Sequence, residues 1–166
     1  MQERSTTGRT EFFRAMFTIP GRAIPKPRMT RRDKWAKRKC VLTYIRWANH
    51  VRAIAGGKVQ DPIGIIALVY LGFPKTYSAA KKQKLQGELH RQKPDGDNIL
   101  KGLCDAICKS DERIATKFIQ KHWDDGKGER VEIMVWNSDF ELTSIWCKNV
   151  NASEKGKDAG EMQIIF

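Results

Sequence analysis

The clearest pattern along the chain is a two-residue alternation of apolar and polar side chains at positions 13–19 and again at 131–136. Side chains of a strand point alternately to its two faces, so both segments are predicted to be strands with one buried face. Residues 63–71 are instead almost continuously apolar and lie between prolines and a glycine. That length and punctuation favour a central strand that is buried on both faces.

Apolar residues recur at helical spacing in two other segments. One helix is predicted to end at Gly56-Gly57, with an apolar face made by Val41, Ile45, Ala48, Val51 and Ala55. A second has its apolar face at Ile99, Leu103 and Ile107. The lysine-rich stretch 78–89 is either a short helix or an ordered loop, and residues 113–123 fit a strand or a helix. Residues 161–166 suit a late edge strand.

Length and composition limit the class of protein. A chain of 166 residues with 40% hydrophobic residues suits one globular domain with an ordinary core. No apolar run is long enough to span a bilayer, and the first ten residues lack the apolar region of a signal peptide. We therefore expect a cytoplasmic protein without a membrane partner, whose four cysteines are reduced.

Positive charge dominates most of the chain. Lys and Arg number 31 against 19 Asp and Glu, which gives a formal net charge of +12. Residues 138–166 hold five acids and three bases, a net of −2, so residues 1–137 carry +14. Such an excess indicates a polyanionic partner, most often nucleic acid, although a solvated basic surface is the simpler alternative.

Basic residues are densest in segment 28–39, where they surround Trp35. Basic side chains beside an aromatic ring suit phosphates and an unstacked base. A solvated loop explains the same composition equally well. A second group of lysines follows at Lys81, Lys82 and Lys84.

An acidic group stands out against this background. Asp95 and Asp97 are separated by one residue, so in an extended segment they point to the same face. Asp97 is placed as the N-cap of the helix that follows. Lys101 and Asp105 succeed it at four-residue steps and are predicted to share one side of that helix.

Convergent carboxylates of this kind are the oxygen ligands that Mg²⁺ prefers. Two such ions about 4 Å apart activate water and stabilise the leaving oxygen of a phosphodiester, and a nearby lysine stabilises developing charge. The alternative is structural: a helix cap followed by an exposed Asp-Lys-Asp ladder. A zinc site at Cys104, Cys108 and His122 is a third hypothesis, but both cysteines fall on the apolar stripe of the helix. His90 is a candidate DNA contact, and His50 is expected to face solvent.

The segment around the acids resembles a known family. Residues 93–101 (KPDGDNILK), then 105–107 (DAI) and 111–114 (DERI), are similar to the K/R-P-D-x-D-N-x-x-K core and following motifs of the RusA family of Holliday junction resolvases. Residues 19–28 are similar to its N-terminal segment. The resemblance implies a small α+β fold, a mixed β-sheet packed with helices. It divides the chain into a flexible N-terminus at 1–11, a nuclease domain at 12–137 and an extension of unknown role at 138–166.

The same resemblance implies the site and the activity. It identifies metal-binding carboxylates at Asp95, Asp97 and Asp111 and a catalytic lysine at Lys101. Ser110 stands where the family has a first aspartate and Arg113 where it has glutamine, so Glu112 and Asp105 stay open as the third carboxylate. The implied function is a homodimeric, Mg²⁺-dependent endonuclease, with Mn²⁺ as a substitute, that resolves four-way DNA junctions in recombination and repair.

Residues expected to hold the DNA come from three segments: Lys26, Arg28, Arg31, Arg32, Lys81, Lys82, Lys84, Arg91 and Lys93. Two alternatives to junction resolution stay open. One is a structure-selective nuclease for forks or flaps, and the other is a non-catalytic basic protein that binds nucleic acid.

Overall fold

Four strands form one mixed sheet in the order β1-β4-β2-β3. The computed structural model describes residues 14–36, 38–56, 59, 62–108 and 111–137. The strands are β1 (Arg14–Pro20), β2 (Gly64–Leu71), β3 (Thr116–Trp123) and β4 (Arg130–Trp136). The predicted α+β fold is confirmed.

Strand pairing explains the sequence patterns. β2 lies between β4, which is antiparallel to it, and β3, which is parallel. Its central place accounts for the unbroken apolar run, as predicted. Gly64 at its start faces the ring of Trp136, where a Cβ atom would lie only 2.0 Å from a ring carbon. Among the four strands, β1 pairs only with β4 and β3 only with β2, and the outer side of β3 also forms a short antiparallel bridge between His122 and Leu89.

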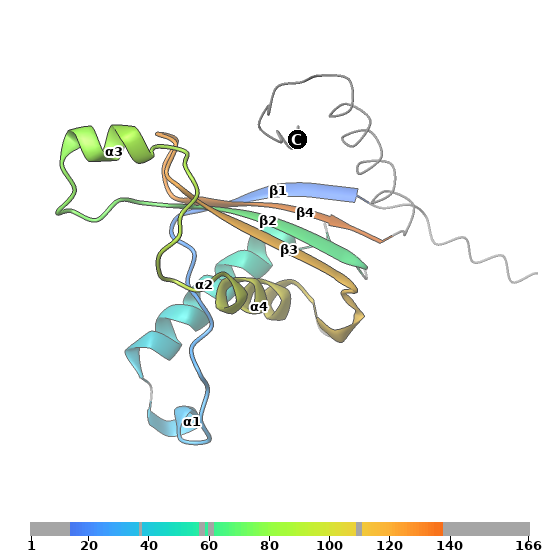
Figure 1. Ribbon diagram of the computed structural model, residues 1–166. Helices are drawn as coiled ribbons and strands as arrows, with labels where there is room; N and C mark the ends of the chain where they lie inside the picture. Colours follow the sequence, from blue (N-terminus) through green and yellow to red (C-terminus); the bar gives the residue numbers. More distant parts are fainter. Residues whose placement is uncertain (1–13, 37, 57–58, 60–61, 109–110, 138–166) are drawn as a thin grey trace, which may run out of the picture.

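Helices α2 (Lys39–Ala55) and α4 (Gly96–Ile107) lie together against one face of the sheet (Figure 1). Fully buried side chains from both layers form the core between them: Ile19, Val51, Ile65, Ile99, Leu103 and Ile133. The predicted stripe of α2 was wrong at Ile45, which is 43% exposed. Tyr44 and Trp47 are buried instead, because the helix presents a face rotated by one residue to the sheet and α4.

The parallel pair β2–β3 requires a long crossover, and its parts position the residues discussed below. α3 (Ala79–Leu85) is short and lysine-rich and is capped by Ser78, whose Oγ accepts the N–H of Lys81 at 3.4 Å. It lies beyond the end of the sheet (Figure 1). The chain then returns through residues 86–95 to α4, and a 3₁₀ turn η1 (Asp111–Arg113) leads into β3.

An arm formed by residues 21–36 extends away from the sheet and carries α1 (Asp33–Ala36) at its tip (Figure 1). Asp33 accepts hydrogen bonds from the Thr30 N–H and from Arg38, whose guanidinium also donates to the Arg28 carbonyl at 2.9 Å. These bonds hold the pKa of Asp33 well below its usual value, the Arg38 bond contributing most. The turn of the arm is therefore held by a charged pair, Asp33 within the arm and Arg38 directly before α2.

Predictions for the two ends of the chain are not tested. The N-terminal segment 1–11, the extension 138–166 and the edge strand predicted at 161–166 lie outside the described residues, so the domain boundaries stay predictions. Segment 113–123, which the sequence left ambiguous, is the strand β3 after a 3₁₀ turn. Within the described part of the chain, no helix combines the length and apolarity that a membrane crossing requires.

Candidate active site

A pocket of ≈ 330 Å³ lies between α4, η1 and the start of β3. Its lining residues are Asp97, Leu100, Lys101, Cys104, Asp111 and Lys117. The four from α4 follow helical spacing and so share one face of the helix. Two carboxylates and two lysines thus surround one opening, although Asp97 and Asp111 are 14 residues apart in the chain.

The start of α4 differs from the prediction. The helix begins at Gly96, so its N-cap is Asp95 (φ −67°, ψ 133°), and Asp97 lies in the first turn. Because the backbone changes from extended to helical between the two aspartates, the argument from strand alternation was wrong. Gly96 packs close to β3, where an added Cβ would lie 3.4 Å from the Ile119 side chain. Asp95 is exposed and is not among the residues that line the pocket.

Asp111 reaches the pocket from η1, where Lys117 of β3 lies 3.7 Å from its carboxylate. By contrast, no residue of the described chain donates a hydrogen bond to the carboxylates of Asp95 or Asp97. Lys101 is exposed at the pocket. Uncompensated carboxylates at a helix start are stabilised by the helix dipole, but they keep their oxygen lone pairs for a ligand.

Part of the donor set that a divalent metal needs is present at the pocket. Asp97 and Asp111 line it, and Asp95 is close to Asp97 in the chain. Among the described residues, no three or more His, Cys, Asp or Glu side chains lie close enough together to hold a metal ion by themselves. Carboxylate oxygens without protein donors nevertheless fit Mg²⁺, which keeps several waters and needs few protein ligands.

The two substitute carboxylates occupy different places. Asp105 forms an ion pair with Lys26 and its backbone carbonyl lies 3.5 Å from Arg52, so it faces the arm and α2 rather than the pocket. Each four-residue step along a helix advances by about 40°. Two steps therefore turn Asp105 away from Asp97, against the predicted shared side. Glu112 is exposed on η1.

Two lysines of β3 were missed by the sequence argument. Lys117 lies at the pocket beside Asp111, and Lys121 donates to the carbonyls of Gln92 and Pro94 at 2.6 and 2.7 Å. Their spacing of four residues puts both on the side of β3 that faces α4. Alternation within 116–123 was the available signal, but it has meaning only once the segment is known to be a strand.

The arm is attached to α4 through Lys26. Its backbone N–H donates to the carbonyl of Asn98 at 2.9 Å, while its ammonium pairs with Asp105. Lys26 was predicted to bind DNA, but its charge is already compensated by Asp105. This residue ties the base of the arm to the helix that carries the acidic motif.

The remaining basic residues lie on exposed surfaces. Arg28, Arg31 and Arg32 are exposed on the arm, as is Trp35 at 81%. Arg91 and Lys93 are exposed on the loop before α4. In α3, the Lys81 ammonium lies 3.7 Å from the centre of the Tyr77 ring, and Lys82 and Lys84 follow on the same short helix.

The zinc hypothesis finds no support among the described residues. Cys104 is 1% exposed in the core, and burial raises the pKa of its thiol to about 11. His122 stacks on Tyr70 and its Nδ1 lies 2.9 Å from the Gly87 carbonyl. His50 faces solvent as predicted, whereas His90 is buried.

Comparison with known proteins identifies a family match. The family model described as "Endodeoxyribonuclease RusA" matches residues 20–136, more than two thirds of the chain. The matched segment contains the pocket and all residues predicted for the site. A search of curated proteins found no match.

Proposed function

Because the chain belongs to the RusA family, endodeoxyribonucleases that resolve Holliday junctions, we propose that it cuts four-way DNA by metal-assisted hydrolysis in the pocket between α4 and β3. The observation that carries this proposal is the meeting of Asp97, Lys101 and Asp111 at one pocket in a strongly basic chain. Carboxylates that converge beside lysines on one opening suit a divalent cation together with a phosphate.

The carboxylates of Asp95, Asp97 and Asp111 would hold Mg²⁺, or Mn²⁺ in its place. The bound metal supplies an activated water and stabilises the departing oxygen of the phosphodiester. Lys101, exposed at the same pocket, is positioned to bind the scissile phosphate and to offset charge in the transition state. Lys117 holds Asp111 in place through its ion pair.

Two further residues position the acidic motif. Lys121 fixes the Gln92 and Pro94 carbonyls directly before Asp95, and Lys26 bonds the Asn98 carbonyl directly after Asp97. The motif is thus held at both ends, by β3 on one side and by the arm on the other. A site held to sub-ångström accuracy needs such support from neighbouring groups.

DNA contacts are proposed for the exposed basic residues of the arm, of α3 and of the loop before α4. Phosphate contacts of this kind position a duplex without specifying its sequence. Trp35, exposed among the arginines of the arm, offers a stacking surface for an unpaired base at the branch point. We also propose a two-fold homodimer, because two symmetry-related sites can cut two opposed strands of one junction.

The test is cleavage by the purified protein of a four-way junction, a fork, a flap and a linear duplex of matched sequence, with and without Mg²⁺. We expect paired nicks in the junction only when Mg²⁺ or Mn²⁺ is present. Preferred cutting of forks or flaps would favour the alternative nuclease, and binding without cutting under any metal would leave a nucleic-acid-binding protein. Sedimentation at the same concentration tests the dimer. We also propose a cytoplasmic location, because the proposed substrate is cellular DNA.

A further inference from the structure

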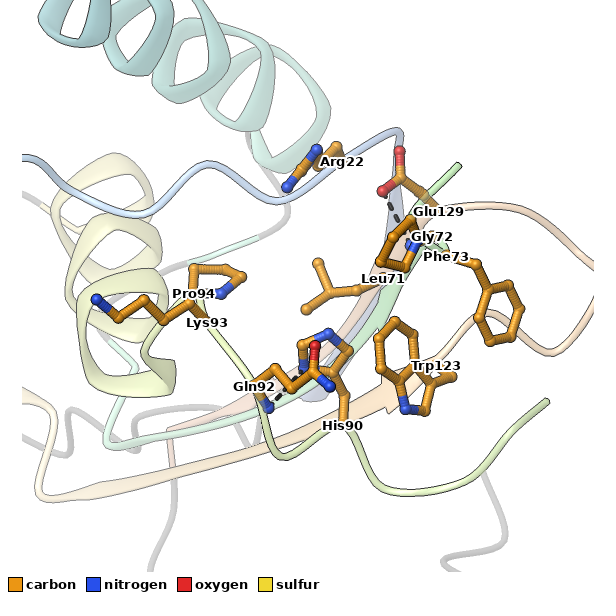
Figure 2. Close-up of a pocket in the computed structure, with 11 residues that line it drawn as sticks. Arg22, Leu71, Gly72, Phe73, His90, Gln92, Lys93, Pro94, Trp123 and Glu129 are labelled. Carbon is orange, nitrogen blue, oxygen red and sulfur yellow. Dashed lines mark hydrogen bonds between the residues drawn. The ribbon is translucent and has the colours of Figure 1, made fainter. Parts of the chain in front are cut away.

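The pocket lined by Asp97 and Asp111 is called the acidic pocket below. A second pocket, of ≈ 250 Å³, lies at the opposite end of β3. It is enclosed by the end of β2, the loop before α4 and the residues around Arg22 and Glu129 (Figure 2). Lys117 of the acidic pocket and Trp123 of this one are six residues apart on β3, or about 20 Å at 3.3 Å per residue. The two pockets therefore border the same strand, one at each end of β3.

Aromatic rings form one wall. The Trp123 ring is stacked on Phe73, with centroids 5.1 Å apart and planes 6° from parallel, and His90 lies against it at 4.1 Å. Trp123 is 3% exposed and Phe73 half-buried. The wall is held in place by backbone bonds from His90 N–H to the Lys121 carbonyl and from Trp123 N–H to the Glu88 carbonyl. Trp123 is covered by Phe73, Tyr77 and His90, so the accessible ring of the wall is the half-buried Phe73, which lines the pocket. An aromatic ring held rigidly in this way can stack a nucleobase of any sequence.

His90 adds a directional donor. It is 6% exposed, and its Nδ1 accepts the N–H of Gln92 at 3.4 Å. That bond assigns the hydrogen of the neutral ring to Nε2. Burial lowers the pKa of His90, and Lys121 and Arg22 lower it further, so the ring is neutral at pH 7. A neutral imidazole with a free N–H can donate to a carbonyl or ring nitrogen of a base.

Charge is arranged differently inside the pocket and at its rim. Arg22 and Lys93 are exposed at the rim, and no ion pair engages either of them within the described chain. Glu129 lies at the end opposite His90 (Figure 2), with one carboxylate oxygen accepting the Gly72 N–H at 2.9 Å. An acid inside disfavours a buried phosphate, whereas cations at the rim attract phosphates on either side. The pocket matches a neutral base flanked by two phosphates.

We propose that this pocket binds a nucleobase unstacked from the DNA strand near the cut, and that it thereby selects which sequences are cleaved. The proposal rests on the proposed function, because the strand must lie in the acidic pocket at the same time. Lys93 links the two sites, since it stands at this rim and two residues before Asp95. Hydrogen bonds from His90 would discriminate among bases, while stacking on Phe73, which Trp123 supports from behind, would supply affinity.

The experiment is single-turnover cleavage of a set of junctions in which each nucleotide near the cut is replaced in turn by an abasic site. For the unmodified protein we expect one position whose loss slows cleavage by at least about tenfold, as removal of one base–aromatic stack does. His90→Asn should slow cleavage of the intact junction by a smaller factor, because it removes the hydrogen bond and leaves the stack. The abasic site should then cost this variant less than it costs the unmodified protein, because both changes remove the His90 hydrogen bond.

His122→Asn is the matched control, since this histidine stacks on Tyr70 outside the pocket and should respond to the abasic site as the unmodified protein does. Urea unfolding checks that each variant folds. If His90→Asn does not fold, Phe73→Leu is measured in its place, and the same results support or overturn the proposal. The proposed role of the pocket would be overturned if the rate losses from the variant and from the abasic site multiplied independently. It would also be overturned if a junction that is still cut showed no sensitive position. Neither result would contradict the nuclease activity. A protein that cuts no junction would instead overturn the proposed function.

Discussion

Two acidic segments of this basic chain contain similar residues, but the carboxylates of only one of them are hydrogen-bonded within the described structure. Asp95-Gly96-Asp97 opens α4, and Asp124-Asp125-Gly126 turns the chain from β3 to β4. Asp125 receives two bonds from the Arg130 guanidinium, at 2.8 and 2.9 Å, and Asp124 accepts the N–H groups of Gly126 and Gly128. The first segment receives no such donors from the described residues.

The two segments differ in the donors that surround their carboxylates. Arg130 is buried, lies 3.7 Å above the Tyr70 ring and also bonds Glu132, so the second segment is part of a satisfied network. Bonding to Arg130 lowers the pKa of Asp125 to about 2. In the first segment, by contrast, no described residue donates a side-chain hydrogen bond to the carboxylates.

The largest expected effect separates the two segments directly. Asp97→Asn and Asp95→Asn should each lower single-turnover cleavage by at least about 10²–10³-fold, since an amide is a poor metal ligand. Junction affinity should persist, and stability should change by less than about 1 kcal/mol, the size of a helix-dipole effect. Gel shifts and urea unfolding measure both. Substantial turnover in both variants would remove these residues from the site.

Lys101→Ala should cost the next most. Loss of a positioned charge typically costs about 10²–10³ in rate, or roughly 2.7–4 kcal/mol. The measurement is single-turnover cleavage of bound junction at saturating Mg²⁺. Lys127→Ala, in the turn of the second segment, is the matched control and should keep the full rate. A rate for Lys101→Ala within a few-fold of the unmodified protein would make Lys101 a charge-balancing residue.

Neutralising the arm tests where DNA affinity resides. Changing Arg28, Arg31 and Arg32 together to Gln should flatten the slope of log affinity against log salt by up to about 0.9 for each phosphate that the arm no longer neutralises. Cleavage of saturated junction should survive, because the three arginines do not line the acidic pocket. Equilibrium binding at several salt concentrations gives the slope. An unchanged slope would mean that the arm does not bind DNA phosphates and would point to Lys81, Lys82 and Lys84 instead.

The smallest effect concerns the structural segment. Asp125→Asn should keep the rate of cleavage but lower the free energy of unfolding by about 1–2 kcal/mol at pH 7, from the lowered pKa at 1.36 kcal/mol per unit, reduced for partial exposure to solvent. Because the folded pKa lies below the unfolded value of 3.8, this stability is present above pH 4 and is lost as the pH falls toward 2. Urea unfolding of both proteins from pH 7 to pH 3 should show the difference shrink. A constant difference would exclude this carboxylate as its source.

Local patterns in the sequence were enough to predict three of the four strands, the two main helices and the family. Alternation at 13–19 and 131–136 and the apolar run before Gly72 depend on neighbours two residues apart, so they are visible within one segment. The motif around Asp95, Asp97 and Lys101 pointed to a DNA endonuclease, and the family match agrees with that activity. None of these signals requires knowledge of a distant part of the chain.

Which groups meet depends instead on the pairing of distant segments. The packing of α4 beside β3 brings Asp97 to Asp111 and Lys117, and the bridge between Leu89 and His122 places His90 against Trp123. Periodicity within any one of these segments could not reveal either meeting. In the same way, Asp105 faces away from the pocket toward a partner 79 residues distant in the chain. Local patterns fix the direction of a side chain along its own element, but the order of strands in the sheet fixes what that side chain faces.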